Sequence, residues 1–172
     1  MKISSVKRML TLYLVNHILS GTRFFAAKRW LLRHIGWVIG EGSCIVGPVF
    51  NSAVLQIGCH SWIGRELTVN GNGTVIIGDN CDIAPGVTFF TGGHQIGNQE
   101  RRAGLGESYT IKIGDGTWLG GNCTVLGNTC VGSGCVIAAC ACVTESIPDN
   151  TLAGGVPARM IRSLCDEDLS SF

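Results

Sequence analysis

Aliphatic residues recur at every sixth position through most of the chain. From Ile113 the sequence divides without a gap into the units IGDGTW, LGGNCT, VLGNTC, VGSGCV, IAACAC and VTESIP. The first position of each unit is aliphatic, and the fifth is small in all but the last unit. The same spacing appears earlier, in blocks that begin at Ile39, Ile57 and Ile77, with short interruptions between them. One repeating pattern therefore organises the chain.

A period of six residues is neither the 3.6-residue period of an α-helix nor the alternation of an ordinary strand. It is typical of a hexapeptide β-helix, an all-β fold in which six residues form one short strand and one turn, and three such units complete a coil. Stacked coils pair their strands about 4.8 Å apart. The first and fifth positions are expected to point into the core. This predicts that Cys81, Cys123 and Cys135 are small buried apolar groups.

Composition narrows the class of protein. The 172 residues include 25 Gly and carry a net charge of +1, so a nucleic-acid partner is not expected. The nine Cys are an odd number, no secretory signal is visible, and no CxxC pair occurs. Neither a disulfide framework nor a structural zinc site is therefore expected. A protein without metal, in a reducing compartment, is the simplest interpretation.

The six-residue pattern stops within the stretch TFFTGGHQIGNQERRAG. The last unit before the interruption ends at His94, and the pattern resumes at Ile113. The segment 95–112 is expected to loop out from a corner of the β-helix, and long loops in compact domains are often functional. Histidine is the commonest general base near neutral pH. His94 is therefore a candidate base, and a turn residue beside a mobile loop is the alternative.

Over about residues 35–162 these hexapeptides resemble the left-handed β-helix acyltransferases, a resemblance that also supplies the expected handedness. TGGH resembles the T-G-H or T-x-H context of the catalytic base in galactoside, maltose and exopolysaccharide O-acetyltransferases, which implies this role for His94. WLGG resembles the W-I-G-x motif whose amide binds the oxyanion, which implies this role for Gly121, with Trp118 beside it. The resemblance implies direct transfer without an acyl-enzyme.

The stretch AACACVTESIPDNTLAGGVPARMIR resembles the C-terminal signature of the same enzymes. In that family it lines a slot for acetyl-CoA on the outside of the β-helix. One departure is Glu145, which stands where relatives often have Lys. For the two arginines, an exposed C-terminal surface is the alternative to phosphate binding. The implied contacts are Ala139 with the pantetheine arm, Thr144 near the adenine, and Arg159 and Arg162 with phosphates.

The acceptor is less well defined by the sequence. Galactoside and maltose enzymes carry an Asn one coil before the base, and the matching position here is Gly64. The loop HQIGNQERRAG instead resembles exopolysaccharide or capsule-type acetyltransferases. Glu100 and Glu107 are candidates for orienting His94. The candidates for the acceptor side are Asn70, Asn72, Arg101 and Arg102.

Residues 1–38 precede the repeat and are expected to form one or two helices. Seven of the 13 Lys and Arg lie in residues 1–33, and no acidic residue occurs before Glu41. This segment either caps the open end of the β-helix or lies on an anionic membrane surface, and both roles are compatible. The expected organisation is thus a helical segment at 1–38, a β-helix domain at 39–162 and a tail at 163–172.

Together these observations predict a cytoplasmic homotrimer, located at the inner face of the membrane if the basic segment binds lipid, with active sites between subunits. The expected reaction is acetyl-CoA-dependent O-acetylation of a sugar hydroxyl during surface polysaccharide assembly. Serine, an amino-sugar nitrogen or an antibiotic hydroxyl are alternative acceptors. A γ-class carbonic anhydrase needs three metal-binding histidines, and only His60 and His94 lie inside the repeat. A non-catalytic scaffold would not need the TGGH, WLGG and C-terminal motifs.

Overall fold

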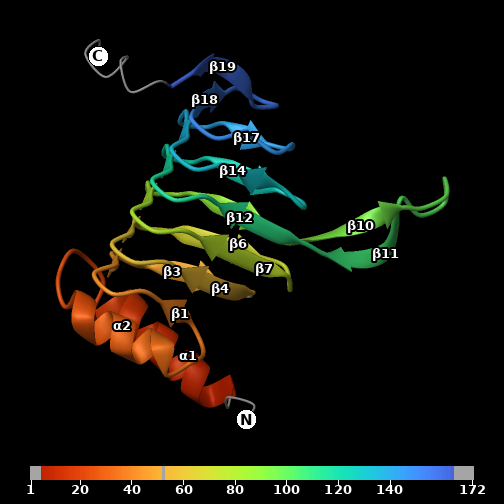
Figure 1. Cartoon of the computed structure of the whole chain (residues 1–172). Coiled ribbons are helices and arrows are strands. Elements are labelled where there is room, and N and C mark those ends of the chain that lie inside the picture. The colour runs from red at the N-terminus through yellow and green to blue at the C-terminus, as the bar shows by residue number, and fades with distance from the viewer. Residues whose placement is uncertain (1–4, 52, 165–172) are drawn as a thin grey trace.

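A computed structural model describes residues 5–51 and 53–164. A β-helix fills most of the chain, and its coils rise from the N-terminal helices to the C-terminal strand (Figure 1). Each coil adds one strand to each of three parallel sheets. This confirms the predicted left-handed parallel β-helix of hexapeptide repeats with a short N-terminal helical segment.

The three parallel sheets are here named walls A, B and C. Wall A contains β1 (Val38–Ile39), β4 (Val54–Ile57), β7 (Thr74–Ile77), β12 (Thr110–Ile113) and β15 (Cys130–Val131). Wall B contains β2 (Cys44–Ile45), β5 (Trp62–Ile63), β8 (Asp82–Ile83), β13 (Trp118–Leu119), β16 (Val136–Ile137) and β18 (Thr151–Gly154), with β19 (Arg159–Ser163) antiparallel at its end. Wall C contains β3 (Val49–Asn51), β6 (Leu67–Asn70), β9 (Thr88–Phe90), β14 (Thr124–Leu126) and β17 (Cys142–Val143).

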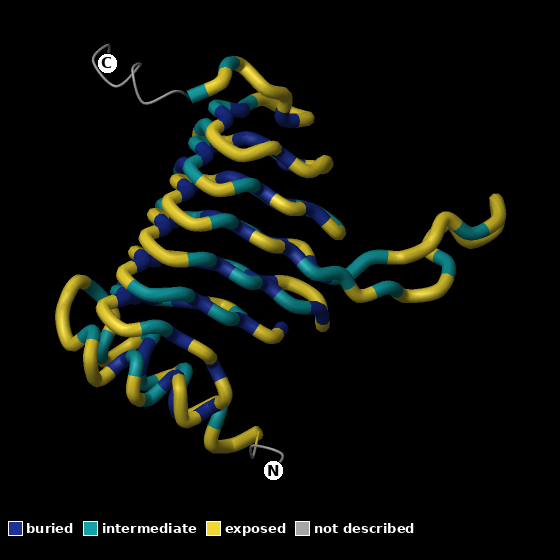
Figure 2. The backbone as a smooth tube through the Cα atoms, in the orientation of Figure 1, coloured by how far each residue is buried: buried dark blue, intermediate teal, exposed yellow. Residues whose placement is uncertain are grey.

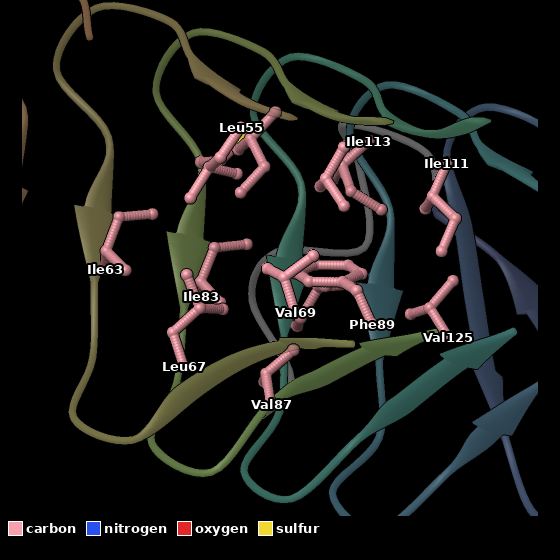
Figure 3. Packing of buried hydrophobic residues seen from close by; sticks show 14 of the residues in the cluster. Leu55, Ile63, Leu67, Val69, Ile83, Val87, Phe89, Ile111, Ile113 and Val125 are labelled. Atoms are coloured by element: carbon pink, nitrogen blue, oxygen red, sulfur yellow. The ribbon is translucent and has the colours of Figure 1, made fainter. Parts of the chain in front are cut away.

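The interior of the prism is formed by the positions that the six-residue pattern selected. The aliphatic first positions from Ile113 to Val143 are at most 2% exposed. Figure 2 shows buried and exposed residues alternating along each coil, and Figure 3 shows aliphatic side chains and Phe89 packing between the walls. Burial raises the pKa of the thiols of Cys81, Cys123 and Cys135. These cysteines are core residues, as predicted.

Two helices cross the N-terminal end of the β-helix (Figure 1). They are α1 (Ser5–Tyr13), which continues as a π-helical turn at Leu14–Ile18, and α2 (Phe25–Arg33). Their side chains Val15 and Leu32 are fully buried and belong to the same apolar core as the coils. The helices therefore close the end of the prism.

Polar side chains of these helices satisfy the open edge of the first coil. The Arg33 Nε donates to the carbonyl of Ile39 at 2.9 Å, and the buried Lys28 Nζ donates to that of Val46 at 3.3 Å. An uncapped edge would expose such groups to pairing with another chain. The remaining bonds are Arg29 to the Ser43 carbonyl, Arg8 to the Asn51 carbonyl, and the Asn16 side chain to both backbone groups of Val49.

The outer face of α1 is apolar. Val6, Met9, Leu10 and Tyr13 are each more than half exposed, whereas the polar Thr11 is buried against the coils. Since amphipathic helices usually bury their apolar stripe, this arrangement is inverted. At the opposite end of the molecule, β18 and β19 pair antiparallel and close the last coil. Of the expected tail at 163–172, residues 165–172 lie outside the described part.

Candidate active site

The interruption in the repeat forms an antiparallel hairpin. Its strands are β10 (Gly92–Ile96) and β11 (Ala103–Ser108), which leave the corner between walls C and A and extend away from the coils (Figure 1). The main chain closes at the base, where the N–H of Tyr109 donates to the carbonyl of Thr91 at 2.7 Å. Wall A resumes at Thr110, three residues earlier than the sequence pattern indicates. Most of the predicted loop is thus regular β-structure.

The hairpin fixes the orientation of His94. Its Nδ1 lies 3.0 Å from the carbonyl oxygen of Gly104 on the facing strand. A carbonyl can only accept, so this contact assigns the proton to Nδ1 and leaves the lone pair on Nε2. An imidazole held in this way can accept a proton at Nε2. The orienting group is a backbone carbonyl, which no sequence motif reveals.

Neither Glu100 nor Glu107 orients His94. Glu107 pairs in register with Gly93, and successive residues of a strand point to opposite faces. Its carboxylate accepts hydrogen bonds from the Tyr109 hydroxyl at 2.7 Å and the Gln95 amide at 3.0 Å. These donors hold the pKa of the Glu107 carboxyl below its usual range. Glu107 therefore braces the hairpin on the face away from the imidazole.

A pocket of about 400 Å³ opens beside His94. Asn70 and Asn72 line it, so the structure brings these two acceptor-side candidates to the histidine. The Ser108 hydroxyl donates to Asn72 Oδ1 at 2.7 Å, which leaves the amide Nδ2 of Asn72 as a donor. Phe90 provides an apolar side, and Glu107 and several glycines also line the pocket. Amides, a hydroxyl and one aromatic ring can bind a polyol.

The two arginine candidates lie elsewhere. Arg101 lines a second cleft of about 510 Å³ on the hairpin, which also reaches His94. The Arg102 guanidinium donates to the carbonyl of Gly97 at 3.3 Å and thus belongs to the hairpin tip. Neither side chain lines the pocket of Asn70 and Asn72.

The predicted oxyanion donor stands at another corner. Gly121 follows β13 at the turn from wall B to wall C and stacks on Pro85, whereas His94 follows β9 at the opposite edge of wall C. Within the described residues, no acceptor is found for the backbone N–H of Gly121 or of Ala139 one coil above. Both groups are therefore available to a ligand. One chain does not bring them to the His94 pocket.

The remaining predicted residues lie near the C-terminal end. Thr144 is exposed directly after β17, and Arg159 and Arg162 belong to β19. The Arg159 guanidinium lies 3.4 Å from the carboxylate of Glu145, the residue that departs from the family signature. Both side chains are more than half exposed, so this ion pair is weak. Among the described residues, no three His, Cys, Asp or Glu side chains gather in a metal-binding arrangement.

Comparisons with known proteins agree with this architecture. The family described as bacterial transferase hexapeptide (six repeats) matches residues 110–145. The galactoside O-acetyltransferase of Escherichia coli is 35% identical over 140 residues, which cover 80% of this chain and 69% of that protein. A putative acetyltransferase of Saccharomyces cerevisiae is 34% identical over 134 residues, which cover 74% of this chain and 68% of that protein.

Solved structures show the same similarity. A galactoside acetyltransferase in complex with coenzyme A superposes with a TM-score of 0.82 at 28% identity, covering 97% of this chain and 84% of that one. A hexapeptide-repeat acetyltransferase of Vibrio cholerae in complex with acetyl-CoA gives a TM-score of 0.80 at 28% identity, covering 94% and 87%.

Proposed function

This chain belongs to the hexapeptide-repeat acetyltransferase family, and on that basis we propose that it transfers the acetyl group of acetyl-CoA to a sugar hydroxyl during surface polysaccharide assembly. The observation that carries the proposal is the His94 imidazole, held through Nδ1 on the Gly104 carbonyl beside the pocket that Asn70 and Asn72 line. The polysaccharide role rests on the loop sequence and on the apolar outer face of α1.

The geometry supports a direct transfer. His94 Nε2 accepts the proton of the acceptor hydroxyl while the hydroxyl oxygen attacks the thioester carbon. The carbonyl oxygen becomes an oxyanion, which the free N–H of Gly121 stabilises. When the intermediate collapses, the C–S bond breaks and the imidazolium returns the proton to the thiolate of CoA. The buried Cys81, Cys123 and Cys135 take no part, since their thiols face the core.

The separation of His94 from Gly121 supports a homotrimer. These groups lie at opposite edges of wall C, so a complete site requires His94 of one subunit and Gly121 of a neighbour. In the proposed assembly the acetyl-CoA slot follows Gly121 and Ala139 to Thr144, with Arg162 and Arg159 near the phosphates. A monomer is then inactive.

The proposed location is the cytoplasm, at the inner face of the membrane. No helix in the described residues is long and apolar enough to cross a bilayer. The outward Val6, Met9, Leu10 and Tyr13 instead form an apolar stripe on α1, beside the exposed Lys7. A helix of this kind can lie in the interface of an anionic membrane. Within residues 1–33, Arg8, Lys28, Arg29 and Arg33 bind carbonyls, so the apolar stripe carries this part of the proposal.

The test is release of free thiol from acetyl-CoA with neutral sugars, amino sugars, serine and lipid-linked sugars as acceptors. We expect sugar-dependent release, which His94→Ala lowers by about 10²–10⁴-fold. His60→Asn is the matched control, because His60 has a positive φ like Asn80, Asn122 and Asn150. Equal release by the His94→Ala enzyme would contradict the base role. Thiol release with serine but with no sugar would mean that the acceptor is serine and not a sugar.

A further inference from the structure

Two indoles and a carboxylate form a column on the outer face of wall B. Trp62 pairs in register with Asp82 on the next strand, and Asp82 pairs in register with Trp118 on the strand above. The indoles are 37% and 53% exposed. From the strand spacing, the two tryptophans lie about 10 Å apart with the carboxylate between them. We call these three residues the indole–carboxylate column.

The N-terminal cap holds the lower end of this column. The Phe25 ring of α2 meets the Trp62 indole edge-on, with ring centroids 5.7 Å apart. The Lys28 ammonium lies 4.7 Å from the centre of the Phe25 ring and donates to the carbonyl of Gly21 at 2.7 Å. Trp62 is therefore presented in a fixed orientation rather than as a free surface side chain.

The Asp82 carboxylate has no partner of its own. Among the described residues, no hydrogen bond or ion pair to this side chain is found, whereas its backbone N–H donates to the carbonyl of Thr117. Partial burial raises the pKa of the Asp82 carboxyl. A carboxylate set between two exposed indoles without a counter-charge gains from a ligand that donates hydrogen bonds.

The column adjoins the turn that carries Gly121. Trp118 precedes Gly121 by three residues, and Asp82 precedes Pro85, on which Gly121 stacks. A ligand on the column thus lies next to the free N–H of Gly121, where the proposed reaction takes place. The column is also on a different wall from the corner of His94, so only the histidine of a second copy reaches it.

We propose that Trp62, Asp82 and Trp118 form an acceptor subsite for a sugar that carries no negative charge. The C–H face of the sugar ring packs against an indole, and its hydroxyl or ammonium groups donate to the Asp82 carboxylate. In the proposed assembly the phosphates of coenzyme A lie near Arg159 and Arg162, which leaves this column to the acceptor. This inference rests on the proposed sugar acetylation and names the substrate class of that reaction. It favours neutral and amino sugars over acidic ones.

Binding is measured first without acetyl-CoA, so that it does not depend on turnover. Tryptophan emission is followed while a neutral disaccharide, an amino sugar, a uronic acid or CoA is added. We expect a response to the first two, with a half-maximal concentration that rises roughly tenfold in Asp82→Asn. Glu41→Gln, which removes an exposed carboxylate in the turn before β2, and Trp30→Phe, on the outer face of α2, keep the response.

Kinetics then separate the subsite from the donor site. Asp82→Asn and Trp62→Ala should raise the KM for the sugar roughly tenfold and leave the KM for acetyl-CoA unchanged, and Asp82→Asn should also leave the melting temperature unchanged. An unchanged sugar KM in both variants overturns the proposal, as does a response to CoA and the uronic acid but not to neutral sugars. If sugars bind in an Asp82-dependent way but no acceptor releases thiol, the subsite stands and the acetyltransferase proposal fails.

Discussion

The coils from Ile113 to Ile147 and the hairpin from Gly92 to Ser108 are built in opposite ways. In the coils every inward side chain is buried, and each strand pairs in parallel with a strand of a neighbouring coil. In the hairpin most residues are exposed, and its two strands pair only with each other. The coils thus provide most of the buried apolar contacts that stabilise the fold, and the hairpin holds the histidine. Substitutions in the two regions should therefore separate folding from activity.

Removing the hairpin should have the largest effect on activity. Replacing residues 92–108 by Asn-Gly leaves the closure between Thr91 and Tyr109, where the main chains already meet. We expect thiol release to fall to background while circular dichroism still shows a cooperative β-sheet transition. Loss of that transition would mean that the hairpin also supports the coils.

Truncation in the coils should have the opposite result. Ile137 is fully buried, so Ile137→Ala should lower the free energy of unfolding by about 2–5 kcal/mol. Well below its lowered melting temperature, the variant should retain its sugar and acetyl-CoA KM values. Denaturant unfolding measures the change, and Val136→Ala on the outer side of the same strand is the control. A changed KM at a temperature where the variant is fully folded would contradict the proposal that the coils determine stability and the hairpin determines activity.

A single side chain in the hairpin should change acceptor binding without affecting stability. Gly106 faces His94 in register, and a Cβ placed there meets nothing within 4 Å. Gly106→Val should fill the space beside the imidazole and raise the acceptor KM about tenfold, with the melting temperature unchanged. An unchanged acceptor KM would place the acceptor on the other side of His94.

The brace beneath the hairpin should have a smaller, pH-dependent effect. Tyr109 and Gln95 lower the pKa of Glu107 in the folded state. Their hydrogen bonds therefore contribute to the stability of the folded hairpin at pH values above the usual carboxyl pKa. This contribution is lost as the pH falls through the lowered value. Glu107→Gln should therefore lower kcat a few-fold at neutral pH and remove this acid-dependent loosening of the hairpin. Hydrogen exchange of the hairpin amides as a function of pH measures this loosening. Equal pH profiles for the original protein and for Glu107→Gln would show that Glu107 does not stabilise the hairpin.

The smallest effect is expected at the C-terminal end of the coils. Glu145→Lys removes the partner of Arg159 and adds a charge where relatives often have Lys. The dissociation constant of CoA should fall a few-fold at low salt and approach the original value at high salt. Calorimetric titration of CoA measures the change, with Glu41→Gln as a control for lost negative charge. A weaker affinity for CoA would mean that Arg159 does not face its phosphates.

The sequence predicted the coils well because one rule applies to each of them. Residues such as Cys123 and Val125 are buried because the six-residue period sends the first and fifth positions inward. The hairpin obeys no such rule. Its glycine-rich strands do not alternate, and the bond from His94 to Gly104 uses a backbone carbonyl that carries no residue-specific signal. The sequence therefore identified the histidine but not its partner.

The proposed indole–carboxylate column was visible in the sequence, although the motifs identified only Trp118 of its three residues. Trp62, Asp82 and Trp118 each occupy the sixth position of their hexapeptide, in IGCHSW, IGDNCD and IGDGTW. Because stacked coils superpose equal positions, these outward side chains had to form a column. The inward positions define the fold, and the outward sixth positions define this column.

The side chains that cover the first coil also determine where the protein ends. A stack of identical coils has no intrinsic length, since each edge can template another layer, as in a growing amyloid fibre. Here Arg33, Arg29, Lys28 and Arg8 occupy the carbonyls that an incoming strand would use. Without them the first coil would offer unpaired carbonyls to a strand of another chain. The basic N-terminal residues thus prevent a further strand from pairing with the first coil and limit the β-helix to the coils of one chain.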